Sequence, residues 1–190
     1  MDDSANPRPV ADLREHAIEL LTQAASMVGL SVDEARLVVD AMRPVHLLAD
    51  TLLFEQGDSV DNDYMALVLD GQVRVATSAG DAAEEVVVSI VGPGQLIGEM
   101  GVVDGGPRSA SCTAITEVKL GVMSREALLQ LVAEHPSAAA ALMMGMVRNL
   151  ALRLREGNRR LRTLSQVTRA LQKELDASHA VNRRLLDSRD

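Results

Sequence analysis

The chain is nearly devoid of aromatic residues and of cysteine. Its 190 residues include one Phe, one Tyr, no Trp and one cysteine, Cys112. A single cysteine excludes an intramolecular disulfide framework and a cysteine-based zinc cluster. We expect Cys112 to be buried as a small apolar side chain. The four histidines are scattered and never spaced as paired metal ligands, so a histidine-based metal site is not expected: His16, His46, His135 and His179.

Targeting and catalytic signals are also missing. The start, MDDSANPRPV, is acidic and lacks the apolar stretch behind a basic lead that marks a signal peptide. No apolar run approaches the roughly 18 residues that cross a bilayer. We therefore expect a cytoplasmic protein without a membrane partner. No nucleophile elbow, Walker loop or metal motif is present, so we expect no enzymatic activity.

Charge is divided unevenly along the chain. Residues 1–146 carry 8 Lys and Arg against 22 Asp and Glu, a balance of −14. Residues 147–190 carry 11 against 5, a balance of +6, which brings the whole chain to −8. The acidic average argues against a general nucleic-acid binder, but the basic C-terminal part keeps that alternative open.

The N-terminal part is expected to be helical after a flexible tail over residues 1–10. Apolar residues recur at helical spacing from Leu13 to Val28, and Gly29 closes that segment. Ser31 and Glu34 form an S-x-x-E capping box, which predicts a second helix through about Met42. Pro44 is expected to end it.

Residues 45–123 alternate between short apolar runs and turns rich in Gly and Asp, which is typical of a sandwich or barrel. The stretch 98–105 interrupts this pattern and is expected to hold one or two helical turns. The expected strands are His46–Leu48, Leu52–Phe54, Met65–Leu69, Gln72–Thr77, Glu85–Val91, Ser111–Ile115 and Lys119–Met123.

The chain after Ser124 is predicted to be helical again. Ser124 caps a short helix to about Glu134, Pro136 breaks it, and Ser137 is expected to cap a long helix. With Val147 at heptad position a, eight of twelve a and d positions are Leu or Val, which predicts a coiled coil. A lone Asn at position a, Asn182, favours a parallel dimer. The alternative is that this seam packs on the chain's own β domain. The a and d positions are Val147, Leu150, Leu154, Gly157, Leu161, Leu164, Thr168, Leu171, Leu175, Ser178, Asn182 and Leu185.

Position b of the same heptads forms an arginine stripe. The simple interpretation is a solvated outer face with local ion pairs. The alternative is a docking surface for an acidic partner or nucleic acid. The stripe consists of Arg148, Arg155, Arg162, Arg169 and Arg183, with Asp176 between the last two.

The stretch PGQLIGEMGVVDGGPRSA, residues 93–110, suits a sugar-phosphate ligand. Gly94 and Gly98 let the backbone approach a ligand closely, and a helical turn beginning near Gly98 would point free N–H groups at an anion. Arg108 offers a planar, permanently charged fork for phosphate oxygens, and Ser109 adds a hydroxyl. Glu99 can accept hydrogen bonds from a sugar hydroxyl while Arg108 balances its charge.

This stretch resembles the phosphate-binding cassette of the cyclic nucleotide-binding domain family, G-E-[LMI]-[AG]-x(5–6)-P-R-[ST]-A. The chain supplies Gly98-Glu99-Met100-Gly101 and then Pro107-Arg108-Ser109-Ala110, with a second matching block at Phe54–Asp58, Tyr64 and Asp70–Val73. The resemblance covers about residues 31–165. It implies an α+β fold, a jelly-roll-like β-roll of the catabolite activator type, flanked by helices.

The resemblance also implies roles for site residues. Glu99 should bind the ribose 2′-hydroxyl and Arg108 the cyclic phosphate. Ser109 and the backbone N–H groups of Gly98 and Ala110 should complete the phosphate site. The neighbouring Ile97 and Met100 are included in the expected ligand site.

The base is placed less directly. In the family's activators the long helix also contacts the base, which puts Gly157 and Asn158 near it. Asn158 could bond adenine through N6 and N7, whereas Gly157 departs from the activators' hydroxyl residue and leaves the base open. We expect cAMP, with cGMP or a cyclic dinucleotide as alternatives.

The sequence thus predicts a non-enzymatic cyclic nucleotide receptor, a regulator of bacterial type. The expected division is a tail (1–10), N-terminal helices (11–43), the β-roll (44–136) and a dimerisation helix (137–190). The winged helix of related transcription factors is not expected after this helix. The receptor should form a homodimer and relay ligand binding to an unknown protein partner. The alternatives are a ligand-regulated nucleic-acid binder and a ligand-free coiled-coil scaffold.

Overall fold

The computed structural model describes residues 10–23, 30–60, 62–78 and 85–187. The chain divides into two compact units, residues 1–148 and 149–190. The first unit holds the strands and most of the helices, so the predicted α+β class is confirmed. Residues 1–9 of the predicted tail and the end of the first predicted helix lie outside the described residues, whereas Val10, the last residue of the predicted tail, is helical.

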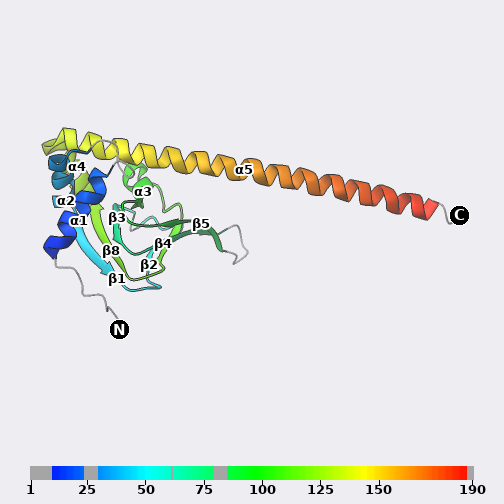
Figure 1. Cartoon of the computed structure of the whole chain (residues 1–190), viewed down its shortest axis with the longest axis horizontal. Coiled ribbons are helices and arrows are strands. Elements are labelled where there is room, and N and C mark those ends of the chain that lie inside the picture. Colours follow the sequence, from blue (N-terminus) through cyan, green and yellow to red (C-terminus); the bar gives the residue numbers. More distant parts are fainter. Residues whose placement is uncertain (1–9, 24–29, 61, 79–84, 188–190) are drawn as a thin grey trace. The chain divides into compact units, whose positions relative to one another are not determined.

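Within the described residues, two four-stranded antiparallel sheets form the roll, with strand orders β1-β8-β3-β6 and β2-β7-β4-β5 (Figure 1). The bounds predicted for β2 and β5 match those observed, whereas the short β6 was not predicted. The strands are β1 Arg43–Leu47, β2 Leu52–Phe54, β3 Tyr64–Asp70, β4 Val73–Ser78, β5 Glu85–Val91, β6 Leu96–Ile97, β7 Ser111–Ala114 and β8 Val118–Ser124.

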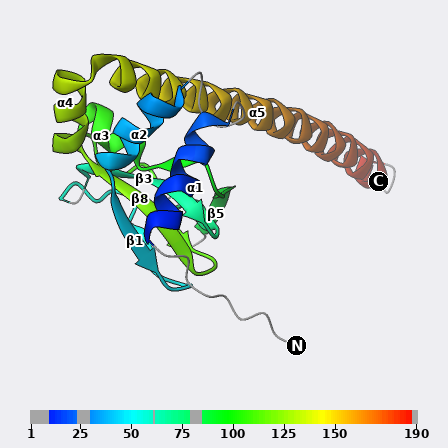
Figure 2. The same cartoon turned by 60° about the vertical axis from the view of Figure 1, so that its left-hand side comes forward.

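The helices of the first unit pack on the outer face of the β1-β8-β3-β6 sheet. Figure 2 shows α1, α2 and α4 gathered there, and α1 and α4 contact β3 and β8 respectively. The predicted one or two helical turns after β6 are present as α3. The helices are α1 Val10–Thr22, α2 Val32–Asp40, α3 Glu99–Asp104, α4 Arg125–Glu134 and α5 Pro136–Asp187.

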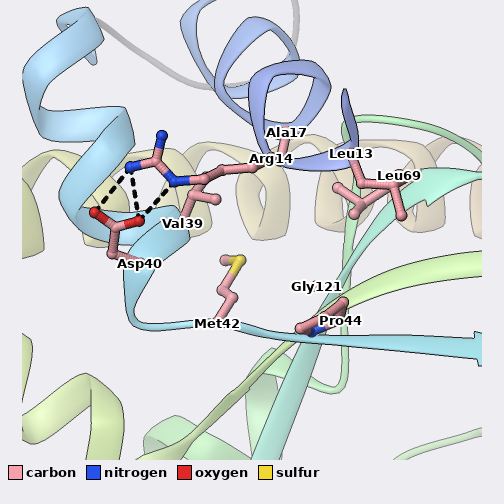
Figure 3. A pocket seen from close by; sticks show the side chains of 9 residues that line it. All are labelled: Leu13, Arg14, Ala17, Val39, Asp40, Met42, Pro44, Leu69 and Gly121. Atoms are coloured by element: carbon pink, nitrogen blue, oxygen red, sulfur yellow. Dashed lines mark hydrogen bonds and ion pairs between the residues drawn. The ribbon is translucent and has the colours of Figure 1, made fainter. Parts of the chain in front are cut away.

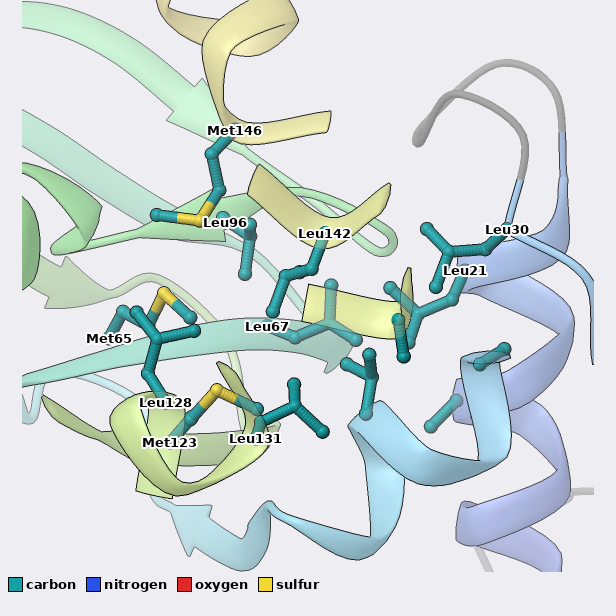
Figure 4. Packing of buried hydrophobic residues seen from close by; sticks show 14 of the residues in the cluster. Leu21, Leu30, Met65, Leu67, Leu96, Met123, Leu128, Leu131, Leu142 and Met146 are labelled. Carbon is teal, nitrogen blue, oxygen red and sulfur yellow. The ribbon is translucent and has the colours of Figure 1, made fainter. Parts of the chain in front are cut away.

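Strand β3 separates two hydrophobic cores because successive side chains of a strand point to opposite faces. Met65 and Leu67 join the core beneath the helices, together with Leu142 of α5 (Figure 4). Ala66 and Val68 join the second core, between the two sheets. A strand buried on both faces explains the continuous apolar run that the sequence shows here.

The helix caps follow the sequence signals in two places. Ser31 and Glu34 form the predicted capping box on α2, and the Ser124 hydroxyl accepts from the Ala127 N–H at the start of α4. A paired salt bridge then ties α1 to α2, since Arg14 donates to both carboxylate oxygens of Asp40 at 2.9 and 3.0 Å. Figure 3 shows this pair at the rim of a small apolar pocket between the two helices and the sheet.

Two local predictions were wrong. Pro44 does not simply follow a helix: α2 ends at Asp40, and Pro44 lies inside β1. Because β1 is an edge strand, a residue without an N–H is tolerated there. Ser137 does not precede α5, since the helix begins at Pro136, a favoured first helical residue. The Ser137 hydroxyl instead donates to Glu34 at 2.7 Å.

The second unit consists of the remainder of α5, which is helical without a break as far as Asp187. Four of its apolar heptad residues, Leu154, Leu161, Leu164 and Leu171, are between 60 and 66% exposed within the single chain. Across the described ranges, no helix is both long and apolar enough to cross a bilayer, and no group of three or more potential metal ligands is present.

Candidate ligand site

The predicted cassette runs from the end of β6 through the short helix α3 to the start of β7 in the other sheet. Ile97 ends β6, Gly98 turns the chain with φ +75°, and Glu99 begins α3. After α3 the chain reaches Arg108 and enters β7 at Ser111. A Cβ on Gly98 would lie 2.7 Å from Arg108 Nη1, so only glycine leaves room for this guanidinium.

The two charged members of the cassette are buried. Glu99 is 2% exposed and Arg108 is 4% exposed, and among the described residues no other charged side chain is buried. Burying a charge is costly unless partners compensate for the lost water. Two such groups nine positions apart in one motif make this stretch the candidate ligand site.

Arg108 is held by backbone carbonyls. Its Nη1 donates to the Tyr64 carbonyl at 2.9 Å and to the Gly98 carbonyl at 3.1 Å. Its own main chain is also fixed, because its N–H donates to the Asp58 carbonyl and its carbonyl accepts from the Gly57 N–H, both at 2.8 Å. The side chain is thus oriented before any ligand arrives, which lowers the entropic cost of binding.

The only two aromatic residues of the chain both pack against this guanidinium. Arg108 Cζ lies 3.8 Å from the ring centroid of Phe54 and 4.8 Å from that of Tyr64. The two rings lie 5.1 Å apart and are tilted by 44°. The role of Phe54 and Tyr64 was missed in the sequence, although both belong to the second block that resembles the family.

Electrostatics at Arg108 reflect its burial. Loss of water lowers the pKa of the guanidinium below its ordinary value, and the hydroxyl of Tyr64, the thiol of Cys112 and the carboxyls of Asp58 and Asp63 raise it in part. Arginine remains charged at neutral pH even so. An anion reaching this group would recover part of the desolvation cost, so the site favours an anionic ligand.

The far end of α3 is anchored as well. Arg125 Nε donates to the Val102 carbonyl at 2.9 Å, which places a cation at the negative end of the helix. Asn62 Nδ2 donates to the carbonyls of Gly105 and Gly106 at 3.1 and 2.9 Å. The turn that carries Glu99 is therefore fixed at both ends.

The other predicted residues fall into three places. Ile97 is buried in the core between the sheets, and Cys112 is buried as predicted. Met100 is 44% exposed, and its Sδ lies 3.5 Å from the hydroxyl of the exposed Ser109.

The remaining predicted residues are Ala110, which is half-buried beside Ser109, and Gly157 and Asn158, which are exposed residues of α5 in the second unit. Ala110 continues the cassette that carries Arg108. The contribution of Gly157 and Asn158 to base recognition stays a prediction.

Comparison with known proteins agrees with this geometry. Residues 44–135 match the family model of the cyclic nucleotide-binding domain. A solved cyclic nucleotide-binding domain from Methylobacillus flagellatus superposes with a TM-score of 0.69 at 32% identity, covering 77% of this chain and 81% of that one.

Two of the curated relatives are named as a bacterial transcriptional regulator and a cyclic AMP receptor protein. The chain is 32% identical over 146 residues to a CRP-like cAMP-activated global transcriptional regulator of Mycobacterium tuberculosis, covering 77% of this chain and 62% of the relative. It is 39% identical over 114 residues to the cyclic AMP receptor protein of Thermus thermophilus, covering 60% and 49%. The chain thus spans less than two thirds of the length of either relative. From the roll, the buried Glu99 and Arg108 and these matches together, the chain belongs to the cyclic nucleotide-binding domain family.

Proposed function

We propose that the chain is a non-enzymatic receptor for cAMP that dimerises through α5 and passes the binding signal to a protein partner. The observation that carries the proposal is the burial of Glu99 and Arg108 in a preformed turn. A cyclic nucleotide offers the matching chemistry, a phosphate for the arginine and a ribose hydroxyl for the carboxylate.

Arg108 is assigned to the cyclic phosphate. Its guanidinium carries five N–H donors in a rigid fork that suits phosphate oxygens. Nη1 supplies two bonds to the carbonyls of Tyr64 and Gly98, which fix its plane. Ser109 lies at the exposed rim of the cassette and adds a hydroxyl donor to the phosphate.

Glu99 is assigned to the ribose 2′-hydroxyl. A carboxylate accepts strong hydrogen bonds from hydroxyl groups, and this one is held at the start of α3 beside the glycine turn. In the complex the phosphate of the ligand pairs with Arg108, and the carboxylate of Glu99 accepts a hydrogen bond from the sugar.

cAMP is the favoured ligand because the names of the two bacterial relatives described above, from Mycobacterium tuberculosis and Thermus thermophilus, refer to it. Asn158 is proposed as the base contact, through N6 and N7 of adenine. cGMP and a cyclic dinucleotide are the alternatives, and a panel of the three ligands distinguishes them.

Dimerisation is proposed from the exposed heptad residues of α5. Leu154, Leu161, Leu164 and Leu171 are each at least 60% exposed in the single chain and fall at a or d positions. A parallel coiled coil would bury them in one seam, at about 25 cal/mol for each Å² of apolar surface removed from water. A change in packing around the roll on ligand binding would then be passed to a protein partner through the paired helices.

Comparing two nucleotides in wild type and in a variant tests the assignment of Glu99 to the ribose 2′-hydroxyl. Wild-type protein should bind cAMP about tenfold or more tightly than 2′-deoxy-cAMP, because a hydrogen bond to a buried carboxylate contributes about 1.5–3 kcal/mol. The difference should shrink in Glu99→Gln and persist in the control Glu117→Gln, an exposed carboxylate that pairs with His46. An equal preference in wild type and Glu99→Gln would refute the ribose role.

Nucleic-acid binding is a second candidate because of the arginine stripe. Arg148, Arg155, Arg162 and Arg169 are all exposed. The ion pairs at Glu156 engage two other arginines, Arg159 and Arg160. If the stripe binds DNA, the affinity of the full chain for DNA in a gel-shift titration should fall steeply as the salt concentration rises. Binding that salt does not change, or no binding at low salt, would eliminate this function.

A further inference from the structure

A second cavity opens between the two sheets of the roll. It has a volume of about 230 Å³, and its lining includes residues of β1 and β2, which are edge strands of the two different sheets. This volume lies below the range of about 300–1,000 Å³ typical of drug-sized ligands, so the cavity suits a smaller molecule. Its lining residues are Arg43, Val45, Leu47, Leu52, Leu53, Tyr64, Ala66, Leu120 and Val122.

Arg43 is the exception in this lining. It pairs with Val122 across the β1–β8 ladder, and Val45 pairs with Leu120 two residues on. Since directly paired residues of antiparallel strands share a face, Arg43 lies on the face that contributes to the core between the sheets. An exposed arginine at the mouth of an otherwise apolar cavity gives it one cationic end.

We propose that this cavity binds a small anionic amphiphile, a medium-chain alkyl carboxylate, with the alkyl chain among the apolar residues and the carboxylate on Arg43. Arginine and carboxylate match as a planar, two-bonded pair. Eight of the nine lining residues are aliphatic or aromatic, and they supply the burial that the chain needs.

The cavity shares a wall with the nucleotide site. Tyr64 lines the cavity, its ring lies 4.8 Å from Arg108 Cζ, and its carbonyl accepts from Arg108 Nη1. An occupant that shifts Tyr64 therefore shifts the guanidinium. By linkage, the amphiphile and the nucleotide then change each other's affinity by the same factor.

Octanoate is the probe, titrated by calorimetry into the full chain without nucleotide, so the result does not depend on the proposed cAMP function. Arg43→Gln should weaken octanoate about tenfold or more, since bonds to a charged group are lost. The matched control Arg36→Gln, an exposed arginine on α2 paired with Asp33, should leave it unchanged. Octanol, which has no charge, should bind wild type and Arg43→Gln equally.

A second variant keeps the test sharp. Leu52→Phe enlarges an exposed lining residue and should reduce binding of both octanoate and octanol. The proposal is overturned by octanoate binding that neither Arg43→Gln nor Leu52→Phe changes, or by no binding at all. Co-sedimentation of the chain with anionic phospholipid vesicles that Arg43→Gln abolishes would assign Arg43 to a membrane surface and also overturn it.

Discussion

Gly98 has a backbone conformation that favours glycine and lies against Arg108, so Gly98→Ala is expected to reduce both stability and nucleotide affinity. Its φ of +75° is unfavourable for a residue with a Cβ, which costs about 1–2 kcal/mol. The added Cβ would also lie 2.7 Å from Arg108 Nη1 and 2.8 Å from Phe54 Cζ. Both contacts are closer than real Cβ atoms approach, so the guanidinium must move.

Moving Arg108 has its own cost. It loses its bond to the Gly98 carbonyl, about 1.5–3 kcal/mol for a charged donor, and part of its stacking on Phe54, about 0.5–2 kcal/mol. Gly98→Ala should therefore destabilise the first unit by about 3 kcal/mol or more. It should also weaken nucleotide binding, because the phosphate group of the ligand meets a displaced fork.

Gly57→Ala is the matched control. Gly57 has a φ of +85°, and no heavy atom lies within 4 Å of where its Cβ would be. It incurs the backbone cost of about 1–2 kcal/mol alone and keeps the N–H that donates to Arg108. Urea unfolding followed by the fluorescence of Tyr64, the only Tyr in a chain without Trp, measures both variants. Equal losses of stability in the two variants would refute the claim that Gly98 is needed to make room for the guanidinium of Arg108.

Three further predictions concern the rest of the molecule. Leu161→Glu should convert the dimer to monomers in analytical ultracentrifugation, because it places a charge in the proposed seam, whereas Arg162→Glu on the outer face should not. If both variants remain dimers, the proposed coiled-coil seam is refuted. Phe54→Leu should weaken cAMP binding about three- to thirtyfold through loss of the ring beneath Arg108, and unchanged affinity by calorimetry would contradict that role. Hydrogen bonds from the Ser137 hydroxyl chiefly, and from Ser31 next, lower the pKa of Glu34 in the folded protein. The ionised Glu34 therefore stabilises the fold above its unfolded pKa, and this stabilisation is lost as pH falls through the lower folded pKa. Urea titrations at pH 7 and about pH 3 should therefore differ less in Glu34→Gln than in wild type.

Local signals were sufficient for much of the fold. The capping box at Ser31, the cap at Ser124 and the strand Glu85–Val91 depend on neighbouring residues, and the structure confirms them. Pro44 was misjudged because its tolerance depends on β1 being an edge strand, which follows from pairing with β8, 71 or more positions away. Ser137 was misjudged because its partner, Glu34, lies on a different helix.

The sequence drew attention to the charged residues of the cassette, but not to the contacts that hold them. The cassette pattern identified Glu99 and Arg108, and the structure places both in the interior. That Phe54 and Tyr64 flank Arg108 could not be read from spacing, because the contacts join β2, β3 and the cassette across the roll. Arg43 was overlooked for the same reason, since its place on an apolar face depends on the register of β1 with β8.

The most direct test of the central claim is a calorimetric titration of cAMP into the wild-type chain and Arg108→Ala, with Arg74→Ala as the exposed-arginine control. The account predicts saturable binding at one site per chain, retained in Arg74→Ala. It predicts a loss in Arg108→Ala of about thirtyfold or more, equivalent to about 2 kcal/mol at 1.4 kcal/mol per tenfold. No heat with either cAMP or cGMP, or full affinity in Arg108→Ala, would contradict it.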